Sequence, residues 1–209
     1  MRVIDDFLAI AEKEVGYTET GVNLTKYNDW ADEESFWFTK VHGLAWCATF
    51  IAWCVIRLSK QYTVELEDFY LDDKCCWSDH WMANFKEKKQ WYSEPSVGDL
   101  AFKNGHVGIV MSYDSLTNIV RTVEGNYDNG VRIVSRGLRE WLGFGRPNWL
   151  IMLRFPTEDN EITSAKEFVI NQGIYIGRED GEMHWEDNLT RKEMSIVLYR
   201  IWKKFLKDR

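Results

Sequence analysis

Long apolar runs, cysteine and basic charge are all scarce in this sequence. No apolar run approaches the roughly 20 residues that a membrane-spanning helix needs, so we expect no membrane span. Four cysteines in 209 residues are too few for a disulfide-held scaffold. The 26 basic and 33 acidic residues give a net charge of −7, which argues against a nucleic-acid binder that neutralises phosphates. Asp5 and Asp6 stand where a secretion signal needs apolar residues, so we expect synthesis in the cytoplasm.

The overall composition is that of a globular protein. Hydrophobic residues make up 45% and charged residues 28% of the chain, which excludes disordered and low-complexity classes. The eleven tryptophans could stack on sugars or peptide planes, but we expect most of them to pack in the core.

Helical patterns precede strand patterns along the chain. Helix-like spacing or continuous apolar character predicts helices over 3–15, 26–30, 46–60 and 78–89. Alternating or β-branched runs separated by turn residues predict strands over 100–103, 106–113, 119–124, 131–135 and 149–155. Helices followed by an antiparallel sheet indicate an α+β domain.

A polar stretch without periodicity, 156–163, follows the last predicted strand. We therefore expect a domain over 1–155, a linker over 156–163 and a small helical module over 164–209. In that module one helix is predicted over 165–172. A second is predicted to start at Thr190, where Glu193 completes a capping box.

Cys47 is the first candidate for chemistry. It stands at the predicted start of the apolar helix, where free amides and the helix dipole favour a thiolate. A buried structural cysteine is the commoner case, and Cys54, two turns further on, fits that interpretation. Only a nearby base distinguishes Cys47.

His106 is the candidate base, because it opens a strand after a tight turn and can sit at the sheet edge. Gly105 and Gly108 beside it leave room for a close backbone approach. Glu124 or Asn126, at the end of the next strand, could accept the second ring N–H of His106, as the third member of a triad does. Taken alone, His106 also fits an ordinary polar surface residue at a strand end, and Glu124 and Asn126 also fit residues that shape a turn.

No metal or other cofactor is expected. The acidic stretch 28–34 lacks the glycine-turned pattern of a calcium loop, which favours a solvated loop. Adjacent Cys75 and Cys76 with His80 do not have the spacing of a zinc site, which favours a structural role.

Taken together, these segments resemble the CHAP family (cysteine, histidine-dependent amidohydrolases/peptidases), papain-like enzymes that cut peptidoglycan. The resemblance covers most of 1–155. It rests on Trp46-Cys47-Ala48, on Gly105-His106-Val107-Gly108 and on Glu124-Gly125-Asn126, with Ser96–Leu100 and Gly143–Trp149 in the expected order. Asn28, Trp30 and Cys76-Trp77 are similar to lysins of phages and prophages of Gram-positive hosts.

The resemblance implies a role for each matching residue. Cys47 is expected to be the nucleophile, His106 the general base and then acid, and Glu124 the group that orients His106. Asn126 is expected to help the third member or the oxyanion. Tyr27 and Trp46 are expected to contact substrate. The implied fold is a papain-like cysteine peptidase domain with helices packed on an antiparallel sheet.

The segment 164–206 resembles a single S-layer homology motif. Such motifs bind anionic secondary cell-wall polymers, and Arg191 at a helix N-terminus would meet that negative charge. A solvated first-turn residue is the equal alternative. Because the family usually presents three motifs, a single copy is expected to pack on the catalytic domain or to form a homo-oligomer.

The sequence thus predicts a peptidoglycan hydrolase, an N-acetylmuramoyl-L-alanine amidase or endopeptidase that uses a cysteine thioester. We expect an endolysin made in the cytoplasm that acts on the wall after release. Two alternatives remain: a cell-wall-binding protein without catalysis, and a cytosolic papain-like amidase or acyl transferase.

Overall fold

The computed structural model describes residues 2–62, 65–149 and 191–201. The chain divides into two compact units, Met1–Arg154 and Phe155–Arg209. Among the described residues, no helix has the length and apolar character needed to cross a bilayer.

Four α-helices of the first unit lie where the sequence pattern predicts them. They are α1 (Arg2–Glu12), α2 (Lys26–Glu33), α3 (Cys47–Ser59) and α4 (Ser78–Glu87). The short helix η1 (Leu66–Phe69) has no counterpart among the predictions. Helix α2 also corrects one expectation, because it takes in most of the acidic stretch 28–34. Thr25 caps this helix by accepting a 3.1 Å bond from the Asn28 amide, so the segment is not a solvated loop.

The sheet has six strands, all antiparallel, in the order β1-β6-β2-β3-β4-β5. The strands are β1 (Trp91–Tyr92), β2 (Leu100–Lys103), β3 (His106–Asp114), β4 (Ile119–Tyr127), β5 (Gly130–Gly137) and β6 (Gly143–Gly145), with the short helix η2 (Leu138–Glu140) before β6. The four long predicted strands are confirmed, and so is the α+β class. The strand predicted over 149–155 lies outside the described residues apart from Trp149, which is in a turn.

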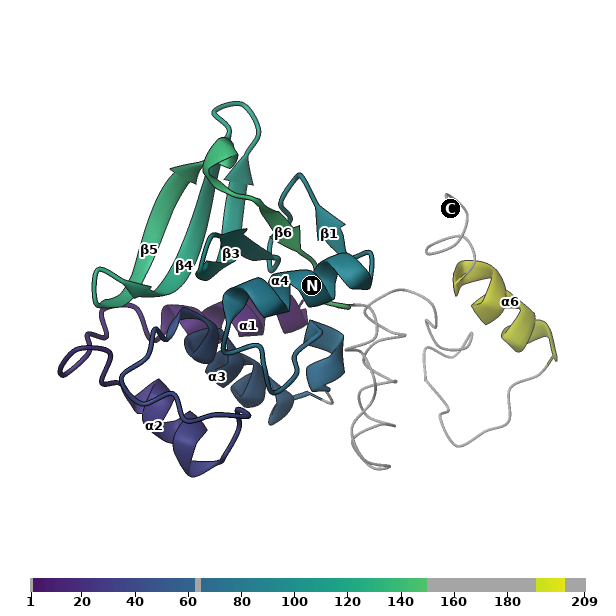
Figure 1. Cartoon of the computed structure of the whole chain (residues 1–209). Coiled ribbons are helices and arrows are strands. Elements are labelled where there is room, and N and C mark those ends of the chain that lie inside the picture. Colours follow the sequence, from purple (N-terminus) through teal and green to yellow (C-terminus); the bar gives the residue numbers. More distant parts are fainter. Residues whose placement is uncertain (1, 63–64, 150–190, 202–209) are drawn as a thin grey trace. The chain divides into compact units, whose positions relative to one another are not determined.

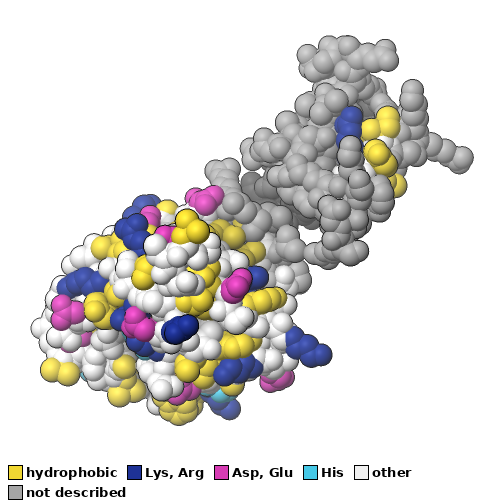
Figure 2. Space-filling model, turned by 90° about the horizontal axis from the view of Figure 1, so that it is seen from above, with side chains coloured by type: hydrophobic (Ala, Val, Ile, Leu, Met, Phe, Trp, Pro, Cys, Tyr) yellow, Lys and Arg dark blue, Asp and Glu magenta, His cyan; other side chains and the backbone are white. Residues whose placement is uncertain are grey.

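Helix α3 is the centre of the core. It is buried along almost its whole length and contacts α1, α2, β3 and β4 (Figure 1). The prediction of a helix that is hydrophobic all round is thereby confirmed. Six of the nine described tryptophans are buried, as expected of core residues. Over the face of the first unit seen in Figure 2, acidic, basic and apolar side chains are interspersed.

A buried ion pair joins the turn before β2 to the segment after β6. Asp99 is fully buried and accepts two hydrogen bonds of 2.9 Å from Arg146. Arg146 also donates to the Ser96 hydroxyl at 2.7 Å. The two segments Ser96–Leu100 and Gly143–Trp149 therefore hold each other in place at one edge of β2.

In the second unit the structure describes one helix, α6 (Arg191–Ile201), which begins one residue after the predicted start at Thr190. The predicted linker 156–163, the helix 165–172 and the capping residue Thr190 lie outside the described residues. The wall-binding or oligomerisation role of this module stays a prediction.

Candidate active site

Cys47 begins helix α3. Its preceding residue, Trp46, is the N-cap and makes no side-chain capping bond, so the first-turn amides keep their positive potential. The Cys47 side chain is only 5% exposed, yet it lines a surface pocket together with Leu44, Trp77, Asp79 and Gly105. Its Sγ lies 4.0 Å from the Gly105 carbonyl oxygen.

His106 is brought to Cys47 by the tight turn between β2 and β3. Gly105 in this turn has φ +64°, a left-handed conformation that glycine adopts without strain. The His106 side chain lies close enough to the Cys47 side chain for the two to interact, and this interaction raises the pKa of His106. Its Nε2 lies 2.7 Å from Glu124 Oε2, which leaves Nδ1 for the sulfur. Cys47 and His106, 59 positions apart in the sequence, are therefore neighbours in the fold.

Glu124, on β4, is completely buried and makes four hydrogen bonds. Besides His106, it accepts from Thr122 Oγ1 at 2.6 Å and from Arg136 at 3.2 and 2.9 Å. Room for this carboxylate comes from Gly108 on β3, where a Cβ would lie 2.7 Å from Glu124 Cγ. At Gly108 the closest approach is that of the Glu124 side chain, and the Val123 backbone oxygen, 3.4 Å from the same Cβ position, is the close backbone neighbour that the sequence suggested.

These contacts shift two pKa values in opposite directions. Burial lowers the pKa of His106, but hydrogen bonds to Cys47 and Glu124 outweigh it and raise that pKa to about 9. Burial raises the pKa of Glu124, but hydrogen bonds from His106, Arg136 and Thr122 outweigh it and lower that pKa to about 2. The site therefore favours an imidazolium beside an ionised carboxylate.

Sequence reasoning missed Thr122 and Arg136. Thr122 stands two residues before Glu124 on β4, so strand alternation alone would have put it on the same face. Arg136 lies opposite Val120 across the β4–β5 pair, and its side chain reaches along the sheet to Glu124. That contact follows from the hairpin register, which the turn 128–130 could have supplied.

Two expected substrate contacts need correction. Tyr27 and Trp46 are both 0% exposed and stack on each other with ring centroids 5.3 Å apart. Tyr27 donates to Glu14 at 2.7 Å and Trp46 to Glu19 at 2.9 Å. Their aromatic faces are covered by core packing, so they hold the start of α3 in place instead of touching substrate.

The remaining candidates do not join the Cys47–His106–Glu124 group. Asn126 has φ +57° at an irregularity in the β4–β5 pairing, and its side chain makes no hydrogen bond among the described residues. Arg191 begins α6, and its side chain lies outside what the structure describes. Cys54 is fully buried, as predicted, and burial raises the pKa of its thiol.

The arrangement has the parts of a papain-like cysteine site: a cysteine at a helix start, an imidazole from the sheet and a buried carboxylate behind it. The family model of the CHAP domain matches residues 39–126, which include Cys47, His106 and Glu124. The match supports a member of the CHAP family with its α+β fold. CHAP domains are typically cysteine- and histidine-dependent amidohydrolases or peptidases acting on peptidoglycan. No curated protein and no solved structure matches the chain.

Proposed function

We propose that this protein hydrolyses an amide bond of peptidoglycan through a thioester on Cys47, and that it serves a phage or prophage as the endolysin of a Gram-positive host. The single observation that carries the proposal is the contact series from Cys47 through His106 to the buried Glu124. On this proposal the enzyme accumulates in the cytoplasm and meets the wall after release.

The first half of the reaction forms the thioester. The Cys47 thiolate attacks the amide carbonyl carbon, and the resulting oxyanion accepts a hydrogen bond from the Cys47 backbone N–H in the first turn of α3. The C–N bond then breaks while the His106 imidazolium gives its proton to the leaving amine. Glu124 stays ionised and holds the ring by its 2.7 Å bond.

The second half restores the enzyme. Neutral His106 takes a proton from a water molecule, and the hydroxide formed attacks the thioester carbonyl. The C–S bond breaks, the new carboxylic acid leaves, and Cys47 returns as a thiolate beside imidazolium. No step draws on a group outside the chain and water.

The decisive test compares wild type with Cys47→Ala in clearing of a purified cell-wall suspension. The substitution removes the nucleophile, so we expect clearing to fall by about 10³-fold or more. Equal clearing by both proteins would refute the thioester mechanism, and wall binding without cutting would then explain any association. Activity on small γ-glutamyl amides with none on walls would favour the acyl-transferase alternative.

The bond that is cut follows from the fragments. Mass spectrometry of material released from walls by the wild-type enzyme distinguishes an amidase, which exposes an N-terminal alanine, from an endopeptidase, which exposes a residue of the stem or bridge.

A further inference from the structure

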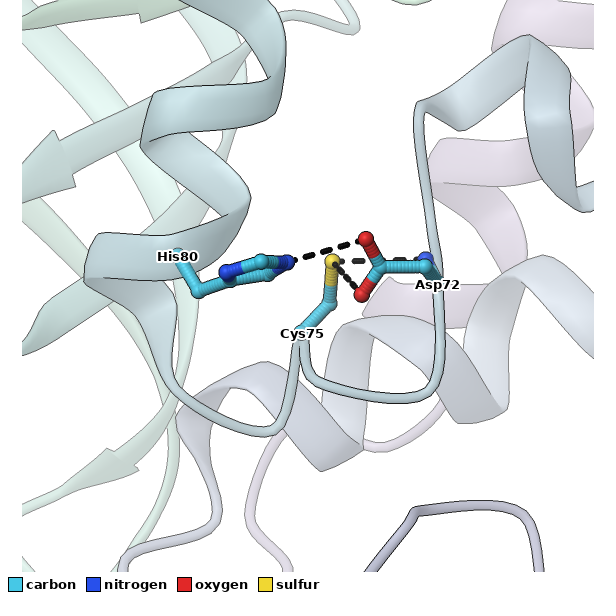
Figure 3. A group of neighbouring side chains, drawn as sticks. All are labelled: Asp72, Cys75 and His80. Atoms are coloured by element: carbon cyan, nitrogen blue, oxygen red, sulfur yellow. Dashed lines mark hydrogen bonds and ion pairs between the residues drawn. The ribbon is translucent and has the colours of Figure 1, made fainter.

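Three side chains capable of binding a metal converge in the segment between η1 and α4. Asp72 and Cys75 lie in this segment and His80 lies in the first turns of α4. Cys75 Sγ is 3.5 Å from Asp72 Oδ1, and His80 Nε2 is 2.9 Å from Asp72 Oδ2. The three ligand atoms all lie within 4.8 Å of one another, and the three side chains point toward a common centre (Figure 3).

The donor set is one imidazole nitrogen, one thiol sulfur and one carboxylate oxygen. Zinc binds this mixture of N, S and O ligands at 2.0–2.3 Å, whereas calcium and magnesium take oxygen alone. Cys75 is fully buried, but the side chains of Asp72 and His80 are 46% and 35% exposed. An ion therefore has a route from solvent to the buried sulfur.

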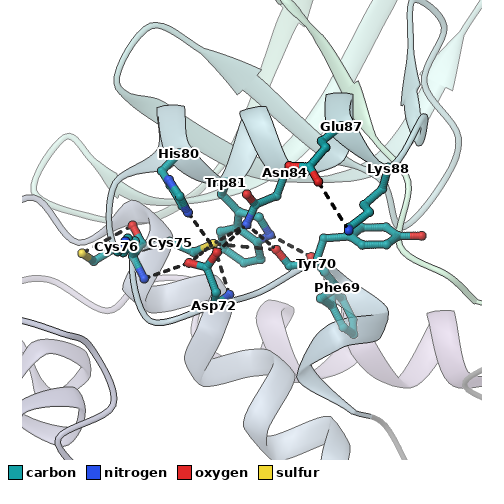
Figure 4. A network of polar contacts seen from close by, with 11 residues as sticks. Phe69, Tyr70, Asp72, Cys75, Cys76, His80, Trp81, Asn84, Glu87 and Lys88 are labelled. Carbon is teal, nitrogen blue, oxygen red and sulfur yellow. Dashed lines mark hydrogen bonds and ion pairs between the residues drawn. The ribbon is translucent and has the colours of Figure 1, made fainter.

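Burial raises the pKa of the Cys75 thiol, but two N–H donors point at its sulfur. Its sulfur accepts hydrogen bonds from the Asp72 backbone N–H at 3.4 Å and from Asn84 Nδ2 at 3.5 Å. Asn84 also donates to Asp72 Oδ2 at 2.9 Å and to the Tyr70 carbonyl at 3.0 Å, so one amide orients two of the ligands (Figure 4). Such second partners fix ligand geometry in metal sites.

We propose that Asp72, Cys75 and His80 bind one Zn²⁺ ion. The Cys75 S–H bond breaks, its proton leaves to solvent and an S–Zn bond forms, with no change of oxidation state. The proton that His80 Nε2 donates to Asp72 at 2.9 Å passes to solvent on binding, Nδ1 is then the protonated ring nitrogen, and the freed Nε2 lone pair and an Asp72 oxygen bind the ion. The Tyr70 carbonyl, 3.7 Å from the thiol, keeps its bond from Asn84 when the thiol proton is lost.

The proposed zinc site is separate from the Cys47–His106–Glu124 group, but it lies in the segment that lines the pocket at Cys47. The segment that holds the ion continues through Cys76, Trp77 and Asp79, which line the pocket at Cys47. On this proposal, a bound ion fixes the conformation of the segment that forms one wall of this pocket. The sequence analysis did not predict zinc, because the adjacent cysteines Cys75 and Cys76 are not followed by a second pair of ligands. Asp72 was not recognised as a ligand, because only the folded chain brings it to Cys75 and His80.

The test uses the full chain with Cys47→Ala, because Cys47 and His106 could themselves hold zinc. After chelator treatment, Co²⁺ titration should give the thiolate-to-cobalt and tetrahedral bands at one ion per chain, and Zn²⁺ should displace them. Adding Cys75→Ser should remove the thiolate band and weaken Zn²⁺ binding about tenfold or more. Adding His80→Gln, a partly exposed position, should weaken Zn²⁺ binding to a similar degree without disturbing the core.

The matched control is Cys76→Ser in the same background, which changes the neighbouring thiol and should leave the bands and the Zn²⁺ affinity unchanged. Circular dichroism verifies that each variant is folded at the temperature of the titration. Absence of a thiolate band, its persistence after Cys75→Ser, or its loss on Cys76→Ser would overturn the proposal. Zn²⁺ should also raise the melting temperature of Cys47→Ala but not that of its Cys75→Ser derivative.

Discussion

His106 Nε2 lies 2.7 Å from Glu124 Oε2, and the carboxylate of that pair has no exposed surface. Because a carboxylate only accepts hydrogen bonds, Nε2 must carry the proton, which leaves Nδ1 to exchange a proton with Cys47. One buried contact thus decides both the tautomer of His106 and the direction in which its ring faces.

Glu124→Gln tests this contact, because it keeps the size of the side chain and removes its charge. We expect cell-wall clearing to fall by about 10²–10⁴-fold. The pKa of His106 should fall from about 9, so any remaining activity should be lost at a lower pH than in wild type. A pH profile of clearing measures both effects. An unchanged alkaline limb would show that Glu124 does not act on His106.

The same pair predicts how stability depends on pH. The pKa of Glu124 is lowered from 4.5 to about 2, so its contribution is present above 4.5 and is lost as pH falls towards 2. The pKa of His106 is raised from 6.5 to about 9, so its contribution is present below 6.5 and is lost as pH rises towards 9. Thermal melts across pH should show the largest advantage of wild type over Glu124→Gln between about 4.5 and 6.5. A constant difference would contradict this account.

How far the sequence predicted the fold depended on the length of each pattern. Helix α3 was predictable because thirteen mostly apolar residues follow one another, and β3 and β4 because each is a nine-residue strand with β-branched residues, bounded by turn residues. Strands β1 and β6 have two and three residues, too few to show a period. They form because β6 pairs with both β1 and β2, a long-range contact that no local pattern contains.

The site was predicted to a similar extent. Cys47 and His106 could be paired because a helix start and a tight turn are local signals, whereas the residues alone left Glu124 and Asn126 as alternatives and the resemblance to the CHAP family favoured Glu124. Residue type alone did not reveal burial, so Tyr27 and Trp46 were assigned to substrate although core packing covers them. Arg136 was missed because its contact with Glu124 depends on the register of two strands.

Arg136 is a positioning residue, since it touches Glu124 and not the reacting atoms. Arg136→Gln removes two hydrogen bonds from a buried carboxylate, so the pKa of Glu124 should rise and its hold on His106 should weaken. We expect clearing to fall about tenfold or more, with the alkaline limb of the pH profile moving to lower pH. Arg136→Lys should restore part of the activity because it returns a charge but not the paired geometry.

The control for this prediction is Arg121→Gln on β4, an exposed arginine whose removal alters the net charge by the same amount. It should leave both clearing and the pH profile unchanged. If the two variants behave alike, the effect of Arg136 comes from overall charge and not from its contact with Glu124.

The wall-binding role predicted for the C-terminal module rests on Arg191 at the start of α6. Arg191→Ala in the full chain should reduce co-sedimentation with walls that carry anionic polymer, because the substitution removes a positive charge at a helix N-terminus. Walls stripped of that polymer should bind wild type and variant equally. Hydrolysis of soluble peptidoglycan fragments should not change, and equal sedimentation with intact walls would remove Arg191 from the binding site.

A substitution at Gly108 tests whether the position of Glu124 in the Cys47–His106–Glu124 group matters. In Gly108→Ala the new Cβ would lie 2.7 Å from Glu124 Cγ, and four hydrogen bonds prevent that side chain from moving aside freely. We expect a loss of about 1–3 kcal/mol in the free energy of unfolding and at least a tenfold loss of clearing. Gly137→Ala on β5 is the matched control, since its Cβ meets only Glu140 Oε1, at 3.7 Å. Denaturant melts and clearing assays should leave the control near wild type, whereas full activity of Gly108→Ala would mean that the position of Glu124 is not critical.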